Sequence, residues 1–447
     1  MSRNSSAALR VVWLWLALAA TASFLQPPAI RAAASPKPNA STSTLSLGRI
    51  VITDVTIVDP SGVRDSPRPV TVVIDAGHII AVDSTVKRTA QRGVQLIAGR
   101  GRFLIPGLWD MHVHVTDAGE QGLGAAVEAG VTGIRDLGGE LTTLDAWRRE
   151  IAAGKRIGPL ILRAGPVVDG INPEAPHRVA VMDSARAVFV VDSLAALGVD
   201  CIKVHNRLPR AAFFATVAEA RRRKLPVAAH LPKKVSAAEA SDAGVASLEH
   251  VAETLLASAI NDPRHPATTM AEAIAANRGT AGDSLFRKFA ANGTAFVPTL
   301  VAYRAFVNWP GTKPESRARR AAVLDSQIVI TGRMHALGVR LLAATDFTDS
   351  TGGRRPGIDL HDELDYFVRA GLRPVEALAS ATTVPVAFLG MSDSLGAIAP
   401  GMRADVVLLD ADPRLDIRNA RKIAAVIAGG RLVRAPADGS ARPGGGD

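Results

Sequence analysis

The sequence predicts an α/β protein, a (β/α)8 TIM barrel with a small β-sandwich domain built from both termini. Two observations carry this prediction. Short alternating apolar segments with glycine turns occur near both ends of the chain, and between them short apolar runs alternate with alanine-rich helical stretches. The chain has 447 residues. This length accommodates a barrel of about 250 residues or more together with a second, smaller domain.

The N-terminus has the three-part pattern of a secretory signal peptide. Basic residues precede an apolar run from Val11 to Ala20, and small-residue cleavage sites follow at Ala22 or Ala34. The run is shorter than the roughly 18 apolar residues typical of a spanning helix, which disfavours an uncleaved anchor. We therefore expect a secreted or periplasmic protein with no stable membrane association. An envelope scaffold that keeps this segment is the alternative.

The domain boundaries follow from composition and periodicity. Strand-rich segments with hairpin turns at Ala76-Gly77 and Gly429-Gly430 define the two parts of the β-sandwich. The expected segments are 1–34 as signal peptide, 35–47 as a Ser/Thr/Pro-rich linker, 48–103 as the first part of the β-sandwich, 104–392 as the barrel, 393–434 as its second part and 435–447 as a disordered tail.

Charge and cysteine content exclude several classes of protein. The chain has 52 Lys and Arg against 42 Asp and Glu, but the basic residues are dispersed, so we expect no nucleic-acid partner. The one dense basic run, 221–224, closes a helical stretch and is expected to be a solvated face. Cys201 is the single cysteine, which excludes an intramolecular disulfide, a cysteine zinc cluster and an iron–sulfur site.

Metal-ligating residue types occur at the ends of several apolar runs, where a barrel places its reactive groups. His112 and His114 follow the run that begins at 103, and residues two apart on a strand project to the same side. His230 and His250 close two further runs. Asp346 closes another, where the alternative role is a helix N-cap. The four histidines are expected to bind divalent metal ions, with structural or surface histidines as the alternative, and Asp346 is a further candidate ligand.

Lys203 lies within another apolar run of the barrel region. An ammonium has three donors and no lone pair, so an unmodified lysine repels a metal ion. A carbamate formed with CO2 is instead an anion with two oxygens, and it can bridge two cations about 3.5–4 Å apart. A lysine whose stem is buried and whose amine reaches solvent is the alternative.

Taken in order, these six residues and several downstream stretches are similar to the metal-dependent amidohydrolase superfamily, in the branch with imidazolonepropionase-like and prolidase-like enzymes. The downstream stretches include 360–364, 370–374, 379–383 and 395–405, and the resemblance covers roughly residues 48 to 435. A family member has a barrel beside a small β-sandwich made from both termini. The resemblance therefore implies the same architecture here.

The resemblance also implies the roles of the six residues. His112, His114 and Asp346 would hold one metal ion, His230 and His250 the other, and carboxylated Lys203 would bridge them. A water or hydroxide between the metals would be the nucleophile, and Asp346 would move its proton to the leaving amine. Zinc is the default for such ligands, while Mn, Fe, Co and Ni remain open.

Five further residues are candidates for substrate contact. His205 shares a face with Lys203, so it either binds substrate or hydrogen-bonds a ligand. Tyr303 either contacts the substrate carbonyl or packs against other side chains of the protein. Arg354 and Arg355 form a carboxylate clamp or a solvated charge pair, and His177 is a further candidate. The segment after Lys203 lacks the Gly-rich loop of many prolidase-like members, which weakens the transfer of dipeptidase specificity.

The expected function is that of an exported, binuclear metal-dependent amidohydrolase. It would cleave an amide, N-acyl or peptide-like C–N bond in a small substrate. A lactonase or phosphoesterase that uses the same site is an alternative, because hydroxide attacks all of these electrophiles. A non-catalytic binding protein on the same barrel is another. The sequence leaves open the substrate and whether the chain forms a homo-oligomer.

Overall fold

The computed structural model describes residues 48–62, 68–84, 93–171, 176–252, 254–255, 269–348 and 353–443. The expected signal peptide and linker lie outside these residues. Within the described ranges, no helix has both the length and the apolar character needed to cross a membrane.

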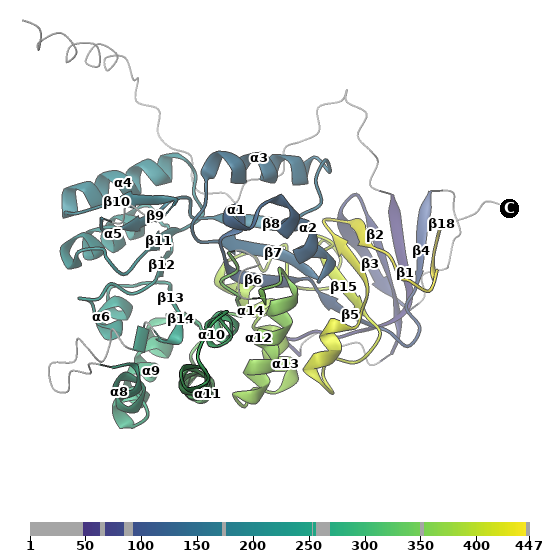
Figure 1. The fold of residues 1–447 in the computed structure, drawn as a ribbon. Coiled ribbons are helices and arrows are strands. Elements are labelled where there is room, and N and C mark those ends of the chain that lie inside the picture. The colour runs from purple at the N-terminus through teal and green to yellow at the C-terminus, as the bar shows by residue number, and fades with distance from the viewer. Residues whose placement is uncertain are drawn as a thin grey trace, which may run out of the picture. The chain divides into compact units, whose positions relative to one another are not determined.

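Strands from both ends of the chain form one hydrogen-bonded β domain (Figure 1). Its path runs β17-β16-β15-β5-β1-β2-β3, and β4 pairs with both β1 and β18. The strands are β1 (Arg49–Ile57), β2 (Val70–Asp75), β3 (His78–Asp83), β4 (Val94–Ala98), β5 (Phe103–Pro106), β15 (Val406–Leu409), β16 (Ile423–Ala428), β17 (Arg431–Arg434) and β18 (Ala441–Pro443). The antiparallel pair β5–β15 joins the N-terminal and C-terminal parts, with Ile105 opposite Val407.

Strand β1 pairs with different strands along its length. Its first residues pair with β2 and β4, and Thr56 and Ile57 pair with β5. The register shifts between Ile52 and Val55, where Asp54 has a φ of 55°. Such a bulge increases the local twist and redirects a strand. Apolar side chains from both ends of the chain, Ile52 and Leu408 among them, then share one core.

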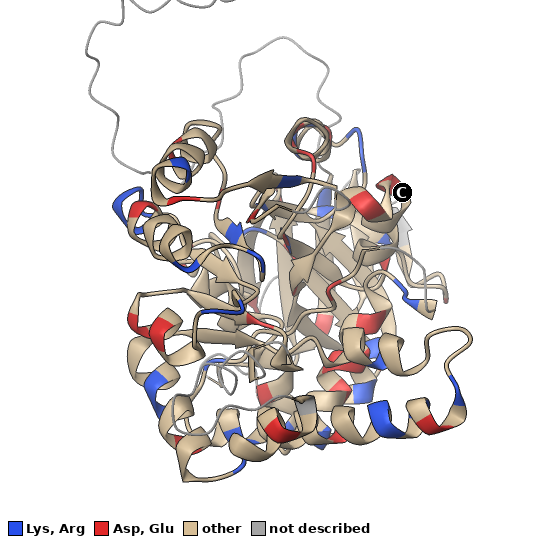
Figure 2. Ribbon diagram, turned by 60° about the vertical axis from the view of Figure 1, so that its left-hand side comes forward, with Lys and Arg blue, Asp and Glu red and all other residues tan. Residues whose placement is uncertain are grey.

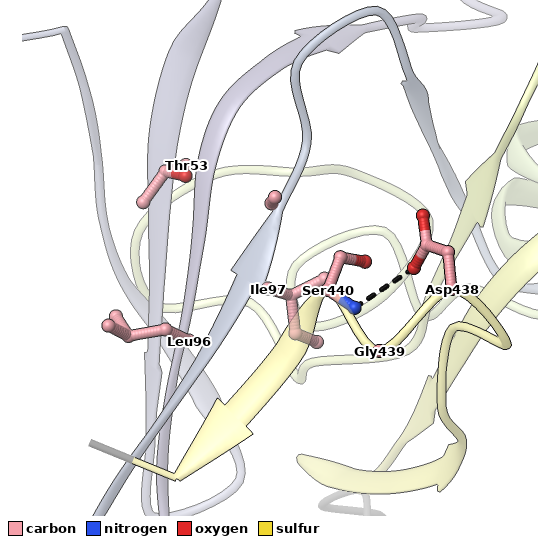
Figure 3. Close-up of a pocket in the computed structure, with 7 residues that line it drawn as sticks. Thr53, Leu96, Ile97, Asp438, Gly439 and Ser440 are labelled. Carbon is pink, nitrogen blue, oxygen red and sulfur yellow. Dashed lines mark hydrogen bonds between the residues drawn. The ribbon is translucent and has the colours of Figure 1, made fainter. Parts of the chain in front are cut away.

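The end of the chain differs from the expected disordered tail. Residues 441–443 form β18, which pairs antiparallel with β4. Before it the chain turns beside β4, where Asp438 Oδ1 accepts a hydrogen bond from Ser440 N at 2.9 Å (Figure 3). Arg102 Nη2 donates to Asp438 Oδ2 at 2.5 Å. Composition missed this strand because its pairing depends on an open edge of β4, far away in the sequence.

The middle region contains two parallel sheets, in agreement with the predicted alternation of strands and helices. The strand pairings within them, among the described residues, are parallel. The three-stranded sheet is β6 (Leu108–Val113), β7 (Val131–Asp136) and β8 (Leu160–Arg163), and the six-stranded sheet has the order β10 (Arg178–Ala180), β9 (Val167–Asp169), β11 (Ile202–Val204), β12 (Val227–Ala229), β13 (Ser247–Glu249) and β14 (Ala295–Val297).

The segment 341–347 links the two sheets. Isolated parallel bridges join Leu341 to Phe296 of β14 and Phe347 to Val113 of β6. Met111 N also donates to Ala343 O at 3.1 Å. The carboxyl ends of β6, β14 and this segment therefore meet on one side, which is where the candidate ligands lie.

Helices surround these strands (Figure 1). They are α1 (Val115–Ala118), α2 (Glu120–Glu128), α3 (Leu141–Ala152), α4 (Ser184–Ala196), α5 (Arg210–Arg222), α6 (Ala237–Asp242), α8 (Met270–Ala276), α9 (Thr280–Asn292), α10 (Leu300–Val307), α11 (Pro314–Ala336), α12 (Ile358–Arg369), α13 (Pro374–Ala379) and α14 (Thr383–Phe388). In α12 the buried residues Leu360, Leu364 and Phe367 recur at helical spacing, so one face of the helix enters the main hydrophobic core. The capping box of Ser236 and Glu239 begins α6.

The surface carries both signs of charge. Figure 2 shows Lys and Arg interspersed with Asp and Glu along the helices in that view. At the basic run that ends α5, Arg222 and Arg223 pair with Glu219 and Asp192. Two cations of the run are therefore paired, and residues 221–224 are exposed, in agreement with the predicted solvated position.

Candidate active site

Strand β6 delivers the first two candidate ligands. His112 lies within β6 and is fully buried, and His114 follows its last residue. The Nε2 atoms of both rings lie 3.4 Å from Asp346 Oδ1. Ligand atoms of these three residues all lie within 4.8 Å of one another. The structure thus brings His112, His114 and Asp346 together, as the sequence predicted.

Asp346 is held in an unusual backbone conformation. Its φ is 52°, in the left-handed region that non-glycine residues adopt rarely. Asp110 fixes the preceding residue, because its carboxylate accepts from Thr345 N at 3.0 Å and from Thr345 Oγ1 at 2.6 Å. Asp110 also accepts from His112 N at 3.3 Å. One buried carboxylate therefore ties together the two segments that carry the ligands.

Lys203 faces the same cluster. It lies in the middle of β11, is 2% exposed, and its Nζ is 3.2 Å from His112 Nε2. Burial lowers the pKa of Lys203 to about 8. A neutral amine is the form that combines with CO2, so burial favours the chemistry expected at this position.

His230 and His250 complete the cluster from β12 and β13. Their ring centroids are 4.9 Å apart, and the rings of His250 and His112 are 4.8 Å apart. His250, with a φ of 65°, donates from Nδ1 to Thr299 Oγ1 at 2.8 Å. The Thr299 hydroxyl donates to Pro298 O. His230 Nε2 is buried and has no hydrogen-bond partner among the described residues.

These nitrogen and oxygen atoms fit a divalent metal site. His112, His114 and His250 each direct Nδ1 to a protein acceptor, which leaves Nε2 as the ligand atom. The Nε2 atom of His230 is buried without a hydrogen-bond partner among the described residues, and binding of a metal ion would give it one. Imidazole and carboxylate donors suit zinc and other first-row metals.

The electrostatics differ among the candidate ligands. Burial and the nearby Lys203 lower the pKa of His112 well below its usual value, so its imidazole is neutral. Burial alone would raise the pKa of Asp346, but the surrounding histidines hold it well below its ordinary value, so Asp346 is an anion. Burial alone would lower the pKa of His114, but its hydrogen bond to Asp346 raises that pKa above its ordinary value.

Glu249 and Arg135 belong to the site but were not singled out from the sequence. His112 Nδ1 donates to Glu249 Oε2 at 2.9 Å, and Arg135 Nη2 donates to Glu249 Oε1 at 3.0 Å. Arg135 also donates to Met111 O and Ser247 Oγ. The sequence did offer one indication of them, because each is a charged residue within a buried strand, Arg135 in β7 and Glu249 in β13.

The candidate substrate residues separate into two groups. Tyr303 lines a cavity of about 500 Å³ that also includes His230, His250 and Asp346. The ring of His205 lies 4.1 Å from that of His230, and its Nδ1 lies 3.4 Å from Asp169 Oδ2. These two residues border the cluster.

The other three candidates make their closest described contacts elsewhere. His177 Nε2 lies 3.4 Å from Asp117 Oδ1, in the short helix after His114. Arg354 donates to Thr345 O and Thr348 Oγ1. Arg355 pairs with carboxylates at the start of α12, those of Asp359 and Asp362. The two arginines thus have partners within the protein.

Comparison with known proteins adds an independent finding. The model of the amidohydrolase family matches residues 103–433. Ochratoxinase of Aspergillus niger is 26% identical over 289 residues, which cover 62% of this chain and 52% of that protein. The chain thus matches about half the length of this relative. Imidazolonepropionase of Symbiobacterium thermophilum is 25% identical over 401 residues, 80% of this chain and 88% of that protein.

Solved structures agree at the level of the fold. A putative prolidase from Bifidobacterium longum superposes with a TM-score of 0.68 at 24% identity, covering 88% of this chain and 96% of that chain. Fold neighbours of this kind imply a TIM barrel with a β domain, the architecture expected from the sequence.

Proposed function

This chain belongs to the amidohydrolase family, and from this premise we propose that it hydrolyses an amide, N-acyl or peptide-like C–N bond in a small substrate with the help of two divalent metal ions. The observation that carries the proposal is the convergence of all six expected ligands. The relatives support the bond type, because they include an ochratoxinase, an imidazolonepropionase and a putative prolidase.

The ligands divide into two sets in this proposal. His112, His114 and Asp346 would hold one ion and His230 and His250 the other, with zinc as the expected metal. Lys203, as its carbamate, would supply oxygen ligands. Bound metal ions lower the pKa of water toward neutrality and polarise the scissile carbonyl.

Asp346 is the proposed proton carrier. Its carboxylate is ionised and 24% exposed, so it faces the space that substrate enters. It accepts a proton from the attacking water and returns it to the nitrogen of the leaving group as the C–N bond breaks. Tyr303 borders the same cavity and is the proposed donor to the substrate carbonyl oxygen.

Parallel rate measurements test the reaction class. The metal-loaded protein is assayed with N-acyl amino acids, Xaa-Pro dipeptides, lactones and aryl phosphoesters. Hydrolysis of one of the first two classes at the highest kcat/KM is the expected result. An exclusive preference for lactones or phosphoesters would replace the proposal by an esterase function at the same site, and binding without turnover would indicate a binding protein.

We also propose export of the mature chain. The support is the pattern of residues 1–34, which lie outside the described part of the structure. N-terminal sequencing of protein recovered from outside the cytoplasm tests it. A mature chain that begins after Ala22 or Ala34 agrees with export and cleavage, and one that retains the apolar run points to an anchored form.

A further inference from the structure

Gln327 is a buried polar residue that faces the candidate active site. It lies on α11, is 1% exposed and lines the cavity shared by His230, His250 and Asp346. Its Nε2 has no hydrogen-bond partner among the described residues. Buried amide groups nearly always have a partner, whereas the two N–H donors of this buried carboxamide, at the wall of the cavity, are unused.

The buried face of α11 around Gln327 is mainly apolar. The buried face of this helix also contains Leu324, Ile328, Ile330 and Met334, so an apolar side chain would suit position 327. A glutamine there lowers stability unless something accepts its hydrogen bond. Local instability of this kind at a binding site is typical of a residue that serves function.

Apart from Thr299 and the candidate ligands, the rest of the described cavity wall is apolar or aromatic. Tyr303 and Phe306 lie on α10 with ring centroids 5.6 Å apart in an edge-to-face arrangement. Pro298, Ala302 and Val251 add apolar surface. Among the described residues that line the cavity there is no lysine or arginine, and Asp346 is the one acid.

We propose that Gln327 is a substrate-binding residue that donates a hydrogen bond to an uncharged oxygen on an apolar or aromatic group of the substrate. The inference rests on the proposed function and names its substrate class, small amides with such a group beside the scissile bond. A carboxylate at this position would be buried with no lysine or arginine among the described residues that line the cavity, and it would share that cavity with Asp346. A neutral carbonyl oxygen accepts from the amide of Gln327 without the free-energy cost of burying a charge.

Three isosteric hydroxamates test the inference, because a hydroxamate can ligate the metal ions while its ring extends into the cavity. They are para-acetyl-, para-isopropyl- and para-carboxybenzohydroxamate, which offer a neutral acceptor, no acceptor and a charged acceptor. Their affinities for the zinc-loaded protein are measured by calorimetry. We expect the acetyl compound to bind about tenfold more tightly than either of the others.

The matched variants are Gln327→Met, which keeps length and removes the donors, and Val329→Leu, on the exposed side of the same helix. Gln327→Met should abolish the preference for the acetyl compound, leave isopropyl binding unchanged and raise the Tm of the metal-free protein. Val329→Leu should change none of these. Gln327→Leu repeats the test if the methionine variant folds poorly.

The outcomes separate the inference from the function on which it rests. If wild-type protein hydrolyses amides or binds hydroxamates but Gln327→Met keeps the acetyl preference, the inference is wrong and the function stands. A lower Tm in the metal-free variant with the preference retained would identify a structural glutamine. Wild-type protein that neither binds a hydroxamate nor hydrolyses an amide contradicts the proposed function, and the inference with it.

Discussion

The imidazole of His112 donates from Nδ1 to Oε2 of Glu249 across 2.9 Å, and neither side chain is exposed to solvent. Burial alone would raise the pKa of Glu249, but Arg135 and His112 hold it below its ordinary value. Glu249 is therefore a permanent anion that fixes the tautomer of His112. The nitrogen left with a lone pair is the one that faces Lys203 and Asp346.

Glu249→Gln tests this positioning role. The amide retains the shape of the carboxylate but presents N–H groups to one of its two donors. We expect metal affinity to fall about tenfold to a hundredfold, as for other lost partners of ligating histidines. Calorimetric metal titration measures the change. Glu150→Gln, which alters a carboxylate paired with Arg156 on the surface, is the control. Equal metal affinity in both variants would contradict the role.

Lys203→Ala removes the proposed bridging group. The variant should lose bound metal and most activity, because no other lysine among the described residues lies beside His112. Short carboxylic acids added with metal should restore part of the activity by supplying the missing oxygens. Metal analysis and turnover are measured together, with Lys288→Ala as a surface control. Unchanged turnover in Lys203→Ala would remove the lysine from the mechanism.

Asp346→Asn separates ligation from proton transfer. Asparagine tolerates the left-handed conformation found at this position and keeps an oxygen for the metal, but it cannot carry a proton. We expect kcat to fall much more than metal content. The two are compared in the same preparation. A parallel fall of both would mean that Asp346 acts as a ligand alone.

Glu363→Gln should change how stability depends on pH. Burial raises the pKa of Glu363 from its ordinary 4.5 to about 8, while its carboxyl accepts from the amides of Leu300 and Val301. The folded state therefore binds a proton that the unfolded state has lost. The contribution of Glu363 to the free energy of unfolding falls as pH rises through this interval.

In the variant this contribution is absent. Urea unfolding at about pH 6 and about pH 9 should give a smaller difference than in wild-type protein. Glu150→Gln, which alters an exposed carboxylate, serves as the comparison. An equal pH difference in all three proteins would show that Glu363 titrates normally.

Much of the fold is encoded in local patterns. The strands of the β domain alternate or run apolar over short lengths, and the barrel region shows strand–helix alternation, so both could be predicted. Strand β18 and the transfer of β1 between two sets of partners could not. Each depends on pairing between distant strands, and composition carries no information about an open edge.

The candidate site shows the same division. His112 and His114 share a strand, so their spacing alone predicts a common face. Glu249 reaches His112 from another strand, and Gln327 reaches the cavity from a helix, so neither role is visible in local spacing. Residues that hold a ligand in place act through long-range contacts, and these require coordinates.

The pairing of β5 with β15 imposes an order on biosynthesis, since the entire barrel region separates these strands in the sequence. A ribosome releases β5 long before its neighbour exists, and during that time the strand has an unpaired edge. A chain truncated before β15 keeps that edge permanently and should aggregate or be degraded. Joining of the two strands thus requires translation through β15, and any product that terminates earlier lacks this pairing.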